Sequence, residues 1–186
     1  MPQEKELIQG CVKGDRASQK ALYDRFCRKM MAICLRYSRS TAEAEDILQE
    51  GFMKVFHSLH AFREESKLET WITRIIINTA LNEQRKKLYL LPMVDVEDVK
   101  IPEREEISLA SFHLSELVSI IQSLPDGCRI VFNLFAIEGY SHKEIAAMLQ
   151  VSEGTSKSQY NRAKNLLRVK IEEQEKAYGK YGKRRV

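Results

Sequence analysis

Apolar residues recur at intervals of three and four along most of this chain, and this spacing constrains the fold more than any other feature. In one early segment these residues are Leu22, Phe26, Met30, Ile33 and Tyr37. Such spacing places apolar side chains on one side of an α-helix. The chain has 8 glycines and 4 prolines, too few turn residues for a fold of many short strands. The sequence therefore predicts an all-α fold.

Capping residues and breaks in the apolar pattern give the expected helix boundaries. A first clear helix follows Gly14 with Asp15 as its N-cap, and a second, over 42–59, starts with a capping box of Ser40 and Glu43. Residues 60–69 lose the periodicity and are expected to form a loop. The remaining helices are expected over about 70–88, from Ser108 to Leu124, around 130–137, over 142–149 and over 153–168.

The segment 89–107 divides the chain. It contains Pro92 and Pro102, and its stretch 96–107 carries five acidic and two basic residues. A stretch without helical periodicity that is rich in like charge is typical of a linker. We therefore expect two small helical domains, 1–90 and 108–175, joined by an extended acidic linker at 91–107 and followed by a basic tail at 176–186.

A helix-turn-helix is predicted at 141–168. Ser141 and Glu144 form a capping box for a short helix, and a tight turn then leads into a longer one. At about 100° per residue, one side of the longer helix carries apolar or small residues. The other side carries hydrogen-bond donors suited to base edges and phosphates. The alternative is an ordinary solvated helix in a helical hairpin. The donor side consists of Lys157, Ser158, Asn161, Asn165 and Arg168, with Arg162 and Lys164 at its edges.

The helix from Thr70 has a second patterned face. Aromatic, arginine and amide side chains lie within about 80° of one another on it. An aromatic ring with amides and arginines suits unpaired bases, which offer stacking surfaces and hydrogen-bonding edges. A partly buried tryptophan beside a solvated polar strip is the plainer interpretation. These residues are Trp71, Arg74, Asn78, Asn82 and Arg85.

The helix over 42–59 has an acidic outer strip. It consists of Glu45, Asp46, Gln49, Glu50 and Met53. Negative charge makes this strip unsuitable for nucleic acid, whereas an exposed acidic strip with a methionine could bind a protein partner. The alternative is a solvated acidic face.

Other classes of protein and site find little support in the sequence. No apolar stretch approaches the roughly 18 residues of a membrane span, and the polar start lacks the apolar core of a secretory signal, so we expect a cytoplasmic protein. The cysteines Cys11, Cys27, Cys34 and Cys128 form no C-x-x-C pair, so no metal site is expected. No cofactor is expected. An enzyme acting on nucleic acid would need clustered carboxylates or a nucleophile with an oriented base, and no such motif is present.

These segments, in this order, resemble the extracytoplasmic-function (ECF) sigma factors of bacterial RNA polymerase, the two-domain minimal members of the sigma-70 family. The resemblance covers about Ile8 to Ile171. In the first domain it rests on residues 44–52, with the pattern Asp-x-x-Gln-Glu, on Phe62-Arg63 and on residues 70–80. In the second it rests on Ser123-Leu124-Pro125, on residues 138–146 and on residues 154–164.

The resemblance implies a promoter-specificity subunit with no enzymatic activity. It implies that Asp46, Gln49, Glu50 and Met53 dock on the clamp helices of the polymerase largest subunit, with a further contact to the flap of the second largest subunit. It implies that the minus-ten element is melted and recognised by Phe62, Lys67, Trp71, Arg74, Asn78, Asn82 and Arg85, with Asn78 helping to hold a flipped base. It further implies that the helix-turn-helix recognises the minus-thirty-five element, and the residues expected to do so are Thr155, Lys157, Ser158, Asn161, Arg162 and Lys164. The resemblance leaves open whether an anti-sigma factor or another regulatory partner controls the protein.

Two other functions remain as alternatives. A helix-turn-helix repressor or activator would bind duplex DNA alone, normally as a dimer that matches two half-sites. That hypothesis leaves the first domain without a role. An enzyme acting on nucleic acid is the second alternative. Copurification with RNA polymerase separates the sigma-factor hypothesis from both.

Overall fold

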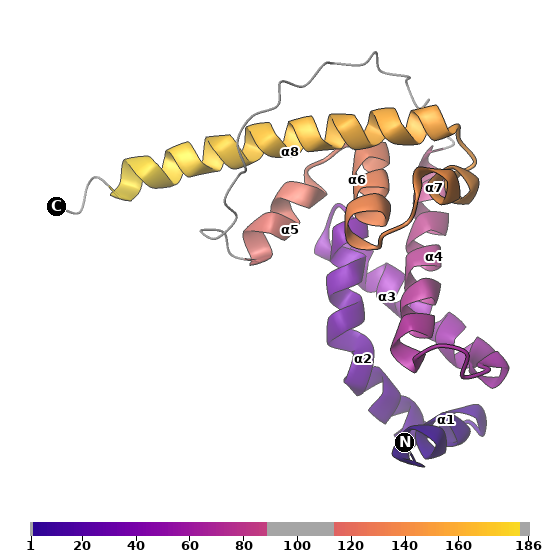
Figure 1. The fold of residues 1–186 in the computed structure, drawn as a ribbon. Helices are drawn as coiled ribbons and strands as arrows, with labels where there is room; N and C mark the ends of the chain where they lie inside the picture. The colour runs from indigo at the N-terminus through magenta and orange to yellow at the C-terminus, as the bar shows by residue number, and fades with distance from the viewer. Residues whose placement is uncertain (1, 89–113, 183–186) are drawn as a thin grey trace. The chain divides into compact units, whose positions relative to one another are not determined.

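The computed structural model describes residues 2–88 and 114–182, and all regular structure in these ranges is helical (Figure 1). The chain divides into two units, Met1–Lys86 and Lys87–Val186. This confirms the prediction of an all-α chain with two helical domains. The linker predicted at 91–107 and the N-cap predicted at Ser108 lie outside the described residues.

The first unit contains α1 to α4 and a short 3-10 helix, η1. Their bounds are α1 Pro2–Val12, α2 Arg16–Tyr37, α3 Thr41–Ser58, η1 Leu59–Ala61 and α4 Leu68–Leu88. The loop expected over 60–69 is therefore shorter, because η1 and α4 each take part of it. The apolar stripe of α2 is buried as predicted, with Leu22 and Met30 both fully covered.

Helix α1 is absent from the sequence-based prediction, which begins its first helix after Gly14. It packs on α2 and buries Cys11. The turn between the two helices uses Gly14 at φ 79°, a left-handed conformation that glycine adopts without strain. Asp15 then caps α2 as predicted, because its carboxylate accepts a hydrogen bond from the Ser18 amide at 2.9 Å.

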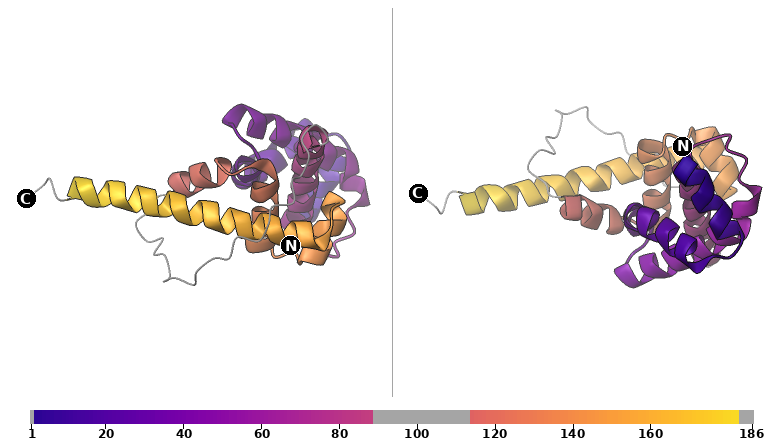
Figure 2. Two further views of the ribbon diagram at one scale, coloured as in Figure 1. Left: turned by 90° about the horizontal axis from the view of Figure 1, so that it is seen from above. Right: turned by 90° about the horizontal axis from the view of Figure 1, so that it is seen from below.

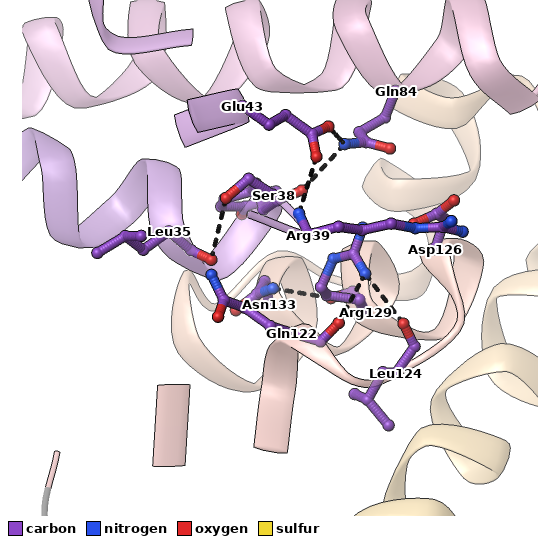
Figure 3. A network of polar contacts seen from close by, with 11 residues as sticks. Leu35, Ser38, Arg39, Glu43, Gln84, Gln122, Leu124, Asp126, Arg129 and Asn133 are labelled. Carbon is purple, nitrogen blue, oxygen red and sulfur yellow. Dashed lines mark hydrogen bonds and ion pairs between the residues drawn. The ribbon is translucent and has the colours of Figure 1, made fainter. Parts of the chain in front are cut away.

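The corner between α2 and α3 differs in one respect from the capping box predicted there. The Ser40 hydroxyl accepts from the Glu43 amide at 3.2 Å as expected. The Glu43 carboxylate, however, accepts from the Arg39 amide at 2.8 Å and from the Gln84 side chain at 2.7 Å. Gln84 also donates to the Tyr37 carbonyl at 3.1 Å, so this buried amide of α4 fastens the corner (Figure 3).

Helices α3 and α4 approach each other closely at Gly51. A Cβ atom at this position would lie 2.4 Å from Cδ1 of Ile76, which is fully buried. A larger side chain at position 51 would therefore force the Ile76 side chain to shift. This close approach places the row of α3 that contains Gly51 against α4.

The second unit contains α5 to α8 and a π-helical turn, η2. Their bounds are α5 Leu114–Gln122, α6 Asp126–Phe132, η2 Asn133–Ile137, α7 His142–Leu149 and α8 Glu153–Gly182. Figure 2 shows α8 as one straight helix that continues past α5 and α6. The helix predicted to end near Arg168 thus extends into the segment predicted as a basic tail.

A buried arginine organises the connection between α5 and α6. Arg129 has no exposed surface, and its guanidinium donates to the carbonyls of Gln122 at 3.2 Å and Leu124 at 2.9 Å. It also forms an ion pair with Asp126 (Figure 3). These bonds satisfy carbonyls at the end of α5 that have no partner within the helix.

Replacing Arg129 with methionine should lower the free energy of unfolding of the second unit by about 3–5 kcal/mol, because one member of a buried ion pair is removed. Far-ultraviolet circular dichroism would follow the transition. Trp71, the single tryptophan, belongs to the first unit, so its fluorescence transition should not move. Adding Asp126→Asn should recover part of the loss. An unchanged dichroism midpoint for Arg129→Met would contradict this role.

Candidate functional site

The acidic strip on α3 is exposed along most of its length. Asp46 and Gln49 are exposed, and Met53 keeps 67% of its surface in contact with solvent. Glu50 is half-buried and pairs with Lys54, with 2.6 Å between Oε1 and Nζ. We call Asp46, Gln49, Glu50 and Met53 the docking strip. An exposed methionine among acidic and amide groups gives this strip both apolar contact area and negative charge.

A groove of about 670 Å³ lies beside the docking strip, between α3 and α4. Two rows of residues at helical spacing line it. The row from α3 consists of Glu50, Met53, Lys54, His57 and Ser58, and the row from α4 consists of Ile75, Asn78, Thr79 and Asn82. The groove therefore joins two members of the docking strip to two of the amides predicted to contact DNA.

The predicted minus-ten residues fall into two groups. Asn78 and Asn82 line the groove and are exposed. Phe62 and Trp71 contact each other elsewhere, with ring centroids 5.3 Å apart and planes inclined at 54°. Two further residues, Lys67 and Arg74, are exposed. They neither line the groove nor take part in the contact between Phe62 and Trp71. Of Arg85 only the backbone, within α4, is described.

Three residues that line the groove were not singled out from the sequence. Lys54, His57 and Ser58 come from α3, whose pattern indicated only a buried side and an acidic side. The Ser58 hydroxyl donates to the Lys54 carbonyl at 2.6 Å, which keeps that hydroxyl close to its own helix. The four-residue spacing of Glu50, Lys54 and Ser58 predicts that these side chains form one row on α3. It does not predict that this row faces α4.

The loop before α4 is held at two points. Phe62 contacts Trp71 of α4, and Glu64 forms an ion pair of 3.0 Å with Lys5 of α1. Glu64 has a left-handed backbone with φ 57°, which is uncommon for a residue with a side chain. The first contact joins the loop to the start of α4, and the second joins it to α1.

The helix-turn-helix in the second unit has the predicted geometry. Ser141 accepts from the Glu144 amide at 3.3 Å, and Glu144 accepts from the Ser141 amide at 2.8 Å, which completes the predicted capping box. Helix α7 is followed by its C-cap residue Gln150, whose left-handed backbone, with φ 58°, forms the tight turn. Ser152 then caps α8 by accepting from the Thr155 amide at 2.9 Å.

The inner side of α8 packs on the rest of the unit as the helical wheel predicted. Ser156 and Ala163 are completely buried. Gln159 is also buried and accepts from the Cys128 thiol at 3.0 Å, a contact that the sequence did not indicate. These contacts fix the rotation of α8 and hence the side that it presents to solvent.

The outer side of α8 carries the predicted minus-thirty-five residues with unequal exposure. Lys157 and Arg162 are exposed, whereas Ser158 and Asn161 are half-buried. Lys157 pairs with Glu153 at 2.9 Å, and Ser158 donates to the Thr155 carbonyl at 3.0 Å. The Lys164 ammonium lies 4.9 Å from the centroid of the Tyr160 ring. Three exposed cations, Lys157, Arg162 and Lys164, thus lie on this side of α8, while the hydroxyls bond within its first turns.

His142 connects α7 to α8. Its Nδ1 lies 2.9 Å from the Ser156 hydroxyl, and its ring stacks on Phe135 with centroids 4.2 Å apart. Burial lowers the pKa of the His142 imidazole, and the Lys157 ammonium lowers that pKa further, while Glu153 opposes them. The folded domain therefore favours neutral His142.

This preference predicts that the second unit loses stability as the pH falls. An unfolded histidine binds its proton near pH 6.5, whereas the folded one binds it at lower pH. The unfolded state therefore holds more protons from about pH 6.5 down to the folded pKa, and stability should fall through that window. Thermal unfolding followed by circular dichroism at pH values between about 7.5 and 5 would measure this loss of stability. His142→Gln should flatten the dependence, and an equal slope in both proteins would contradict the assignment.

Neither a cluster of metal ligands nor a membrane-spanning helix is found in the described residues. Within 2–88 and 114–182 no group of three or more potential ligands could hold a metal ion. The four cysteines are free thiols, and three of them are buried. No helix in these ranges is both long and apolar enough to cross a bilayer.

Similarity to known proteins covers both units. Residues 22–88 match the family model for sigma-70 region 2, and residues 114–167 match that for sigma-70 region 4. The RNA polymerase sigma-H factor of Pseudomonas aeruginosa is 30% identical over 183 residues, covering 89% of this chain and 92% of that protein. The ECF RNA polymerase sigma-E factor of Escherichia coli is 31% identical over 178 residues, covering 89% and 93%.

A solved structure has a related fold. The sigma factor RpoE of Bartonella quintana, crystallised in complex with the anti-sigma factor NepR, matches with a TM-score of 0.51. The two chains are 24% identical, and the match covers 83% of this chain and 96% of that one.

Proposed function

Because this chain belongs to the extracytoplasmic-function sigma factors of the sigma-70 family, we propose how its surfaces divide the work of that family. As an RNA polymerase sigma factor it binds core polymerase and directs promoter recognition and the initiation of transcription. The observation that carries the proposed division is that the surfaces of suitable chemistry lie in two separate units. One unit has the docking strip and the groove, and the other has the helix-turn-helix.

The docking strip binds core polymerase in this proposal. Its acidic and amide groups are complementary to a basic protein surface, and the negative charge would repel DNA. Met53 adds exposed apolar surface for the contact. Complementary charge across an interface speeds association and suppresses wrong partners. The clamp helices of the largest subunit are the proposed partner for this strip, and the flap of the second largest subunit is a further proposed contact.

The groove between α3 and α4 receives a base extruded from the melted minus-ten element. Its volume of about 670 Å³ is within the range of pockets that hold small molecules. The carboxamides of Asn78 and Asn82 offer both donors and acceptors to a base edge. Phe62 and Trp71 provide aromatic surface near the start of α4 for neighbouring unpaired bases.

The helix-turn-helix binds the minus-thirty-five element as duplex DNA. Lys157 and Arg162, exposed on α8, can reach phosphates or the acceptor atoms of guanine in a major groove. The capped first turn of α8 and its packed inner side hold these cations in a fixed orientation. Further contacts to the same DNA would come from Thr155, Ser158, Asn161 and Lys164.

The protein acts by binding alone in this proposal and carries out no covalent chemistry. Base stacking in the duplex is exchanged for contacts to extruded bases and phosphates. We place this activity in the cytoplasm, where bacterial RNA polymerase works. A regulatory protein partner is also proposed, by analogy with the binding of NepR to RpoE.

Separate tests of the two DNA surfaces would examine this division. Lys157→Ala or Arg162→Ala should weaken recognition of the minus-thirty-five element by about 1–3 kcal/mol for a lost base contact. On a template already opened at the start site, transcription should be unchanged, because the groove is untouched. Lys143→Ala, an exposed lysine of α7, is the matched control. Equal losses on duplex and premelted templates would contradict duplex recognition by α8.

A further inference from the structure

One ion pair lies where the docking strip meets the groove. Lys54 and Glu50 are 2.6 Å apart, and their side chains are 43% and 41% exposed. Glu50 belongs to the docking strip, and both residues line the groove. Lys54 is one helical turn further along α3, next to His57 and Ser58. The carboxylate of Glu50 can therefore contact a partner bound to the docking strip and can also pair with Lys54 in the groove.

The groove has few other charged groups. Among the described residues that line it, Glu50 is the only acid and Lys54 the only lysine or arginine; the others are His57 and uncharged side chains. The facing row from α4 offers the amides of Asn78 and Asn82, a hydroxyl and an isoleucine. Among the described residues of the groove, the Lys54 ammonium is therefore the main positive charge that a bound nucleotide could contact, and Glu50 pairs with it.

We propose that the Glu50–Lys54 pair is a switch that couples polymerase docking to the binding of single-stranded DNA. In the free protein Glu50 holds the Lys54 ammonium. When a basic group of polymerase takes up the Glu50 carboxylate, Lys54 is released and binds a phosphate of the strand whose base enters the groove. This inference rests on the proposed roles of the docking strip and the groove.

The strength of the pair suits such an exchange. Partly exposed ion pairs four residues apart on a helix are weak, so a competing cation can replace Lys54 without a large penalty. A lysine has three donors on a flexible stem and can turn from a carboxylate to a phosphate. Because coupling between two binding events is reciprocal, DNA in the groove should also strengthen docking.

Binding of the free full-length protein to a labelled single strand of thymidines, about 12 nucleotides long, tests the switch without polymerase. Glu50→Gln should tighten binding about two- to fivefold, the range for an exposed pair. The substitution should also make the slope of log K for binding against log salt concentration steeper by about 0.7, the change expected for one additional phosphate contact. Fluorescence anisotropy at several salt concentrations gives both quantities.

Two controls separate release of Lys54 from a general change in charge. Glu45→Gln removes the same charge from an exposed residue of α3 that does not line the groove, and it should change binding little. In a Lys54→Met background, Glu50→Gln should give no gain. An equal gain for Glu45→Gln, a gain that survives Lys54→Met, or no gain at all would overturn the switch.

The holoenzyme supplies a second measurement. Once docking has released Lys54, the Lys54→Met holoenzyme should bind the same strand with a salt dependence flatter by about 0.7, and an unchanged slope would overturn the proposal. Failure of the switch is distinct from failure of the proposed function. Docking is tested by a pull-down of the single variant Asp46→Arg, and base binding by promoter melting with Asn78→Ala, and both variants leave the Glu50–Lys54 pair in place.

Discussion

Reversing the charge of the docking strip should abolish binding to core RNA polymerase. We expect Asp46→Arg combined with Glu50→Arg to weaken the complex by about 100-fold or more, because like charges brought together at an interface cost several kcal/mol. Asp46 is exposed and Glu50 half-buried, so the free energy of unfolding should change by no more than about 1 kcal/mol. A pull-down with purified core polymerase gives the affinity, and circular dichroism gives the stability.

A matched variant controls for total charge. Glu6→Arg combined with Asp24→Arg makes the same change at exposed residues of α1 and α2, away from the strip. This variant should bind core polymerase like the wild type. If the strip variant also bound like the wild type, the docking face would be wrongly assigned.

Removing the amide of Asn78 should impair promoter opening selectively. We expect Asn78→Ala to reduce open-complex formation about tenfold or more, since a lost two-bond contact to a base is worth about 1–3 kcal/mol. The loss should depend on which base occupies one minus-ten position. Permanganate footprinting on promoters varied at that position measures both effects. Binding to core polymerase and to duplex minus-thirty-five DNA should persist.

Stability distinguishes this role from a structural one. Asn78 is exposed on α4, and alanine favours helices more than asparagine does, so the Trp71 fluorescence transition should stay in place or rise. Thr70→Ala, at another exposed position of α4, should leave promoter opening unchanged. A uniform loss on every promoter that follows a lowered melting temperature would rule out the base-binding role.

Local patterns in the sequence were sufficient for most of the helices. Capping residues such as Asp15 and Ser141 act within a few residues of themselves, and the structure places them as predicted. Helix α1 was missed because its few apolar residues follow a polar start, and of these only Cys11 is buried, while Val12 stays exposed. Glu43 was expected to complete its own capping box, yet its carboxylate accepts from the Arg39 amide and from Gln84, 41 residues away. Such contacts depend on tertiary packing.

The candidate site shows the same division between local and distant information. The outer faces of α3, α4 and α8 followed from helical spacing alone. The groove did not, because it requires α3 to turn the row containing Lys54 and Ser58 toward α4. In the folded unit Gly51 of α3 lies against Ile76 of α4, a contact between residues 25 positions apart that helical spacing does not indicate. Likewise Arg129 was not singled out, because its partners are mainly backbone carbonyls, which leave no trace in side-chain patterns.

Transcription in vitro from a library of genomic promoter fragments would show directly whether this protein selects promoters for RNA polymerase. We expect core polymerase with this protein to start transcription at a limited set of promoters that share two separated motifs. Neither component alone should do so. The Asn78→Ala variant should shift the selection at the minus-ten motif, and the Arg162→Ala variant at the minus-thirty-five motif. Specific binding of the protein alone to duplex DNA, with no promoter-specific transcripts in the presence of core polymerase, would contradict the account.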